Sequence, residues 1–177
     1  MITIENLNVL VGVGTIVVQV LTVFLIALFF VKEQDIHRLI RKIALPASLV
    51  LVFAGTALTL VYSEYLGVTP CGLCWLQRVG LYPQVILFAI ALFVKDKSVA
   101  LYSIGLSLFG AIVALYQHYL QMGGISSLPC PASGASDCAQ RFLFEFGYIT
   151  FPLSAFSLFA LLIVLMLHYR KKDRQAV

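Results

Sequence analysis

The sequence predicts an all-α membrane protein that crosses the bilayer five times. Of its 177 residues, 61% are hydrophobic and 11% are charged, and the mean hydropathy is +0.99. A soluble domain carries about 25% charged residues, so the composition excludes an ordinary soluble fold. A helix needs about 20 mainly apolar residues to cross the hydrocarbon core. Five runs are long enough, namely 9–31, 43–66, 75–94, 99–122 and 149–169.

The first run is expected to remain in the protein as a transmembrane helix. The segment before it, "MITIENLN", lacks the basic region of a cleavable signal peptide. The run itself is also long enough to span the membrane. The sequence shows no internal repeat and no low-complexity tract, so the spans are predicted to form one domain.

The basic residues predict the orientation of the five spans, because Lys and Arg stay on the cytoplasmic side. In a five-span chain, the loop 32–42, the loop 95–97 and the tail 170–177 all fall on one side. They hold ten of the twelve basic residues, whereas only Arg78 and Arg141 fall near the other side. We therefore predict that the N-terminus is outside and the C-terminus inside. The basic residues are explained by topology and do not indicate a nucleic-acid site.

The four cysteines, Cys71, Cys74, Cys130 and Cys138, all fall on the predicted outer side. Cytosolic reductants do not reach that side, so an even number of cysteines suggests pairs. Cys71 and Cys74 form a Cys-x-x-Cys motif near the start of the third span, next to Pro70, which suits a helix start. A helix N-terminus favours a thiolate. The motif can therefore supply a reactive dithiol at the membrane surface.

Two other interpretations of the cysteines compete with redox chemistry. Seven residues separate Cys130 from Cys138, against the usual two to four between zinc ligands, so we expect no metal site. Structural disulfides are the second alternative. The Cys71–Cys74 ring closes too little chain to be an effective staple. The larger loop between Cys130 and Cys138 leaves that alternative more open there.

Three polar residues near the outer ends of the spans are further candidates. Arg78 lies four residues after Cys74 and so shares its helix face. It either snorkels to the headgroups or binds the polar head of an electron acceptor, since intramembrane ionisable residues are often functional. Gln77 beside it is a candidate polar contact. His118, in the outer turns of the fourth span, is either a structural hydrogen-bonding group or one that moves protons.

These motifs resemble the disulfide bond formation protein B (DsbB) family. The resemblance rests on "PCGLCWLQR" followed by "LYP", on "YQHYLQ", on a second cysteine pair in the next loop, and on "FGYITFPLSAFSLFALL". The short Cys130–Cys138 spacing is closer to the BdbC-type proteins. The resemblance implies that 43–169 form a four-helix transmembrane bundle. Residues 1–42 are then an extra N-terminal helix with its cytoplasmic loop, and 170–177 are a basic cytoplasmic tail.

The resemblance implies an oxidoreductase of the bacterial cytoplasmic (inner) membrane, surrounded by lipid. It would reoxidise a secreted or periplasmic thioredoxin-like thiol oxidase (DsbA-like) and pass the electrons to ubiquinone or menaquinone. Carried over by position, Cys71 and Cys74 face the quinone, and Cys130 and Cys138 meet the partner. Arg78 would contact the quinone, and His118 matches a histidine near it.

Two alternatives from other classes stay open. One is a reductive electron carrier similar to vitamin K epoxide reductase, and the other is a non-enzymatic membrane scaffold with structural disulfides. The first span has no counterpart in the usual four-span form of the family, and its role is not indicated by the sequence.

Overall fold

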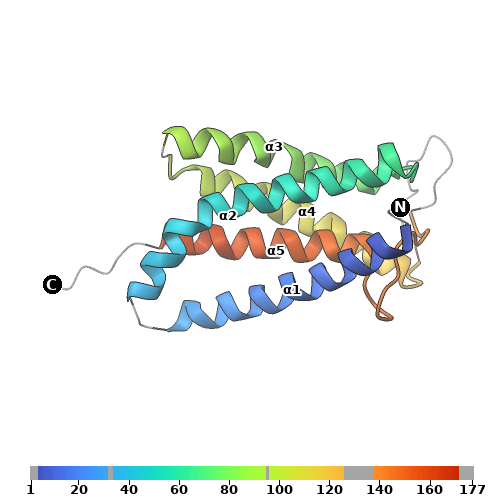
Figure 1. Ribbon diagram of the computed structural model, residues 1–177, viewed down its shortest axis with the longest axis horizontal. Coiled ribbons are helices and arrows are strands. Elements are labelled where there is room, and N and C mark those ends of the chain that lie inside the picture. Colours follow the sequence, from blue (N-terminus) through green and yellow to red (C-terminus); the bar gives the residue numbers. More distant parts are fainter. Residues whose placement is uncertain (1–3, 32–33, 95, 126–137, 172–177) are drawn as a thin grey trace.

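The computed structural model describes residues 4–31, 34–94, 96–125 and 138–171, which form five long helices and contain no strand (Figure 1). Each helix is long and apolar enough to cross a membrane. This confirms the predicted all-α fold with five spans. The helices are α1 (Ile4–Phe30), α2 (Gln34–Leu60), α3 (Gly72–Val94), α4 (Val99–Gln121) and α5 (Phe151–Arg170), and a π-helical turn, η1 (Val61–Tyr65), extends α2.

The predicted span boundaries hold well for the last three helices and less well for the first two. α1 begins at Ile4 rather than at residue 9, and α2 begins at Gln34 rather than at residue 43. Arg38 and Arg41 therefore lie on a helix instead of in a loop. Hydropathy detects only the apolar part of a helix, whereas the backbone hydrogen bonds continue into polar residues at the surface. Figure 1 shows the first turns of α2 at an angle to the rest, and Pro46 explains a bend there.

Helices α2 to α5 form a closed bundle, in which α2 packs on α3, α3 on α4, α4 on α5 and α5 on α2. Small residues allow close approach of the helices, as is common in membranes. A Cβ added at Gly110 of α4 would overlap the ring of Phe159 in α5. A Cβ at Gly80 of α3 would lie 3.2 Å from the backbone oxygen of Leu106. Fully buried side chains fill the bundle interior, among them Val52, Phe88, Leu161, Leu162 and Met166.

A polar cluster joins α3 to α4 inside the bundle. The side chain of Gln84 is fully buried. Its Nε2 donates to Ser107 Oγ at 3.1 Å and to the Gly80 carbonyl at 2.8 Å, and its Oε1 accepts from Ser103 Oγ at 2.7 Å. A buried amide is costly unless its donors and acceptors are paired. This cluster meets that requirement and adds directional bonds to an otherwise apolar interface.

α1 packs along α5, outside the four-helix ring. Hydrogen bonds join the two helices at several levels. Thr15 Oγ1 donates to Ser154 Oγ at 2.8 Å, and Gln19 Nε2 donates to Ser157 Oγ at 3.1 Å. Near the other end, His168 Nε2 lies 3.0 Å from the Leu25 carbonyl oxygen. The extra helix is therefore held by specific polar contacts and not by apolar surface alone.

The two ends of the bundle differ in chemistry. One, here called the cysteine end, carries Cys71, Cys74 and Cys138 beside the start of α3, the end of α4 and the start of α5 (Figure 1). The opposite, basic end carries the α1–α2 and α3–α4 connections and the end of α5. The basic residues described there are Arg38, Arg41, Lys42, Lys97, Arg170 and Lys171. This separation is the arrangement on which the predicted orientation depends; the orientation itself stays a prediction.

Candidate redox site at the cysteine end

A short connection between η1 and α3 places the first cysteine pair. Gly67 has a φ of 69°, and the Val68 N–H donates to the Tyr62 carbonyl at 2.9 Å, which turns the chain back toward the bundle. The Cys71 carbonyl accepts a hydrogen bond from the Trp75 N–H at 3.1 Å, so Cys71 stands at the very start of α3. The helix begins at Gly72, two residues after Pro70. Cys71 is buried, and Cys74 follows in the first turn.

The two cysteines are free thiols whose sulfur atoms lie 3.1 Å apart. A disulfide bond is about 2.05 Å long, so only a small side-chain movement is needed when an acceptor removes two electrons and two protons and the bond forms. The hydrogen bond with Cys74, and after it burial, raises the pKa of Cys71 above its usual value. Cys71 therefore stays protonated in the reduced pair, and a protonated thiol is a poor nucleophile.

Gln117 of α4 holds the reduced pair through its side-chain amide. Its Nε2 donates to Cys71 Sγ at 3.2 Å and to Cys74 Sγ at 3.3 Å. Its Oε1 accepts from Gln77 Nε2 at 2.6 Å, which fixes the amide with its donor group toward the sulfur atoms. Donors directed at a sulfur favour the thiolate over the thiol. The α3–α4 pair thus surrounds the dithiol with oriented polar groups.

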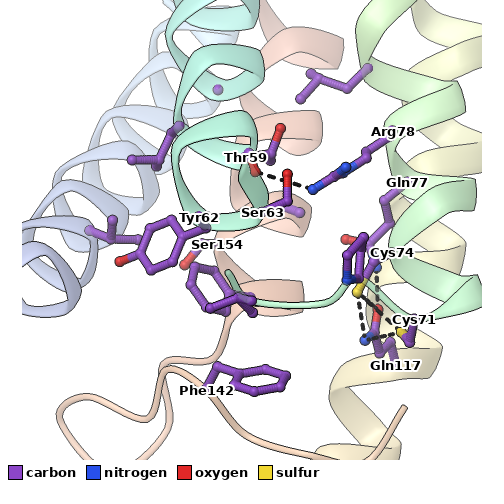
Figure 2. Close-up of a pocket in the computed structure, with 18 of the residues that line it drawn as sticks. Thr59, Tyr62, Ser63, Cys71, Cys74, Gln77, Arg78, Gln117, Phe142 and Ser154 are labelled. Carbon is purple, nitrogen blue, oxygen red and sulfur yellow. Dashed lines mark hydrogen bonds between the residues drawn. The ribbon is translucent and has the colours of Figure 1, made fainter. Parts of the chain in front are cut away.

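A cavity of about 180 Å³ opens beside the cysteine pair, between α2, α3 and α5 (Figure 2). Cys71, Cys74, Gln77 and Arg78 all line it, together with Gln117. Most of the remaining wall is apolar and comes from the other helices, including Val11 of α1. The cavity therefore combines a dithiol, a cation and amide groups with a largely hydrophobic space.

Arg78 reaches from α3 across this cavity toward α2 (Figure 2). Its Nη2 donates to the Thr59 carbonyl at 3.1 Å, and its guanidinium carbon lies 4.9 Å from the centre of the Trp75 ring. The residue is only 8% exposed. Within the described residues, the ion pair found is Arg38 with Asp35, so no carboxylate neutralises Arg78 there. A buried cation that lacks an acidic partner and borders a cavity is suited to bind an electron-rich oxygen.

The structure separates His118 from this group. His118 does not line the cavity. Its Nδ1 lies 2.8 Å from Thr150 Oγ1, and Thr150 caps the start of α5 by accepting from the Leu153 N–H at 3.4 Å. This contact is the structural hydrogen bond that was one of the two interpretations of His118. The predicted position of His118 near an electron acceptor stays a prediction.

The second cysteine pair is only partly described. Cys138 is 1% exposed, is disulfide-bonded, and packs in one small cluster with Cys71, Cys74 and Leu120. Cys130 lies outside the described residues, so its predicted pairing with Cys138 stays a prediction. Cys138, in the connection between α4 and α5, nevertheless lies next to the Cys71–Cys74 dithiol.

Sequence reasoning missed Gln117 and Thr59 as site residues. Both are uncharged polar residues inside apolar spans, and that is the signal that could have found them. Gln117 directly precedes His118. Neighbouring helical residues point about 100° apart, so the choice between them depends on which face of α4 meets α3.

Replacing Gln117 by leucine tests whether its amide activates the dithiol. We expect alkylation of the reduced Cys71–Cys74 pair by iodoacetamide to slow about tenfold, because a hydrogen bond to a charged group contributes about 1.5 kcal/mol. Peptide mass spectrometry of the full chain in detergent measures the rate. Gln84→Leu is the matched control, since Gln84 also joins α3 to α4 but touches neither sulfur. Equal slowing in both variants would show that helix packing, not the amide, is responsible.

Comparisons with known proteins agree with the motifs. A family model described as disulfide bond formation protein DsbB matches residues 37–169. A probable disulfide formation protein C 2 of Bacillus anthracis is 31% identical over 137 residues, covering 77% of this chain and 96% of that protein. A probable disulfide formation protein of Chlamydia caviae is 36% identical over 136 residues, covering 76% and 98%. An SPbeta prophage-derived disulfide bond formation protein B of Bacillus subtilis is 39% identical over 112 residues, covering 63% and 75%. No solved structure matches the chain.

Proposed function

The chain belongs to the disulfide bond formation protein DsbB family, and from that premise we propose that it is a quinone-dependent thiol oxidase of the bacterial cytoplasmic membrane. It reoxidises a thioredoxin-like thiol oxidase outside the cytoplasm and passes the electrons to a membrane quinone. The observation that carries the proposal is the cavity, in which Cys74 and Arg78 line one largely apolar space and Arg78 has no carboxylate partner among the described residues.

The residues of the cavity fit a quinone ring. An apolar cavity of about 150 Å³ is enough to bind benzene, so a cavity of about 180 Å³ admits a single substituted ring. Arg78 and Gln77 would hold the ring, because both line the cavity and both carry N–H donors suited to a carbonyl oxygen. When bound, a quinone supplies an acceptor for two electrons and two protons.

The electrons enter through the loop cysteines. A thiolate of the partner attacks the Cys130–Cys138 disulfide, and resolution of the mixed disulfide leaves an oxidised partner and two loop thiols. These thiols then reduce a Cys71–Cys74 disulfide by a second exchange. Cys138 packs against Cys71 and Cys74, which supports direct exchange between the pairs.

Within the reduced first pair, Cys74 is the sulfur from which the electrons leave. Cys71 is the thiol whose pKa is raised. Cys74 accepts a hydrogen bond from Gln117 and lies one helical turn from Arg78. Arg78 stabilises negative charge at the acceptor oxygen, which is where its free donors are useful. In this proposal the cysteine end faces outward and the basic end faces the cytoplasm.

Quinone reduction by the purified protein in lipid nanodiscs tests the proposal. The reduced thioredoxin-like protein of the same genome and decyl-ubiquinone or a menaquinone analogue are the two substrates. We expect one quinone reduced for each partner disulfide formed, at a rate that depends on both. Electron flow from quinol to the oxidised partner would instead identify a reductase. A protein that catalyses neither reaction would support the scaffold alternative.

A further inference from the structure

The family match begins at residue 37, within α2, so α1 lies outside it. Its contacts at Asn8 and Thr15 nevertheless reach residues that line the cavity. We propose that α1 is a working part of the redox site, in which Asn8 positions Tyr62 and the backbone at Phe142 and so determines how tightly the cavity binds its acceptor. This inference rests on the proposed function, because it assigns a positioning residue to that cavity.

Asn8 joins two distant segments through its side-chain amide. Its Oδ1 accepts from the Tyr62 hydroxyl at 2.7 Å, and its Nδ2 donates to the Phe142 carbonyl at 3.0 Å. Asn8 is buried, and an unpaired amide there would be costly. The amide therefore has one favourable orientation. α2 with η1 and the segment after Cys138 are each held relative to α1.

Both residues that Asn8 holds line the cavity, as does Ser154, which accepts a hydrogen bond from Thr15 of α1. Figure 2 shows Tyr62 and Ser154 across the cavity from Cys74. The Tyr62 ring is nearly fully buried and meets Phe151 edge to face, with ring centres 4.5 Å apart. Such a ring cannot turn without disturbing the cavity wall, so the hydroxyl bond to Asn8 fixes that wall.

α1 also packs tightly against the segment that carries Cys138. A Cβ added at Gly12 would lie 3.1 Å from both the Glu145 side chain and the Phe146 ring. At Gly14, on another face, an added Cβ would meet nothing within 4 Å. The close approach is thus specific to the face of α1 that meets the segment after Cys138.

Contacts of α1 farther along the helix, beyond Thr15, have no such connection to the cavity. Gln19 bonds to Ser157, and neither residue lines the cavity. α1 therefore makes two kinds of hydrogen bond. Those at Asn8 and Thr15 end on residues that line the cavity, whereas Gln19 bonds to Ser157 and Tyr148, which do not line it. This difference separates a positioning role from simple anchoring.

Binding of decyl-ubiquinone to the full chain in nanodiscs, followed by quenching of the only tryptophan, Trp75, gives a dissociation constant without turnover. Trp75 lies beside Arg78, so it reports on the site. We expect Asn8→Leu to raise the dissociation constant about fivefold, as for the loss of one typical buried hydrogen bond. Gln19→Leu should leave it unchanged, although both variants lower the apparent melting temperature.

Tyr62→Phe provides a second variant that keeps the ring and removes only the hydroxyl. It should also weaken binding, and the double variant should bind no more weakly than Asn8→Leu alone, because Asn8→Leu has already removed the bond to the Tyr62 hydroxyl. Unchanged binding in Asn8→Leu and Tyr62→Phe, or equal weakening in Gln19→Leu, would overturn the role of Asn8. If the unmutated protein itself fails to bind and reduce the quinone, the proposed function falls instead.

Discussion

Cys74→Ser is expected to abolish steady-state quinone reduction, with a loss on the order of 10³-fold or more, as for other removed nucleophiles. A serine hydroxyl cannot form a disulfide with Cys71, so electrons from the loop pair have no path to the cavity. The change is nearly isosteric and should leave the fold intact. Turnover of the reduced partner by the purified variant, followed as quinone reduction, measures the effect.

The same variant carries its own control. The Cys130–Cys138 pair is untouched, so we expect rapid oxidation of one equivalent of partner, after which the reaction stops. A variant that shows this single turnover is folded and able to meet its partner. Continued turnover in Cys74→Ser would instead contradict the assignment of Cys71 and Cys74 to the quinone side. That result would indicate that Cys71 and Cys74 are structural cysteines.

The part of the site that lies on one helix could be predicted from the sequence. Cys74 and Arg78 are four residues apart, and a helix brings such residues to one face whatever surrounds it. Both line the cavity. Contacts between helices could not be predicted in this way. The rotation of α4 decides that Gln117 meets the sulfurs while His118 meets Thr150, and no local pattern fixes that rotation.

The same limit applies to α1. Its length and apolar composition predicted a membrane span, and the structure forms a helix there that is long and apolar enough to cross a membrane. Its packing on α5 and the reach of Asn8 to Tyr62 and Phe142 join residues 54 and 134 positions apart. Asn8 was visible only as a polar residue before an apolar run. Only the packing of α1 on the bundle brings Asn8 within hydrogen-bond distance of two residues that line the cavity.

Arg78→Met is the second variant with a large expected effect. Methionine keeps much of the side chain's length and removes all five N–H donors. We expect the KM for decyl-ubiquinone to rise on the order of 100-fold, because charge-assisted hydrogen bonds to the acceptor oxygen contribute about 3 kcal/mol. Exchange between the partner and the loop cysteines should continue at the normal rate. Arg78→Lys should recover part of the loss, since it keeps the charge but not the planar fork.

The stability of Arg78→Met separates function from anchoring. Arg78 is buried and has no carboxylate within ion-pair distance in the described ranges. Burying an unpaired charge is costly, so the variant should melt at the same or a higher temperature while its affinity for the quinone falls.

Arg141→Met is the matched control. Arg141 lies at the same end of the bundle, over the Phe144 ring at 4.7 Å, but it is exposed and does not line the cavity. If Arg78→Met instead lowers the melting temperature and leaves the KM unchanged, Arg78 is a headgroup anchor. If the variant instead melts at a higher temperature and binds the quinone more weakly, the charge of Arg78 serves binding at a cost in stability.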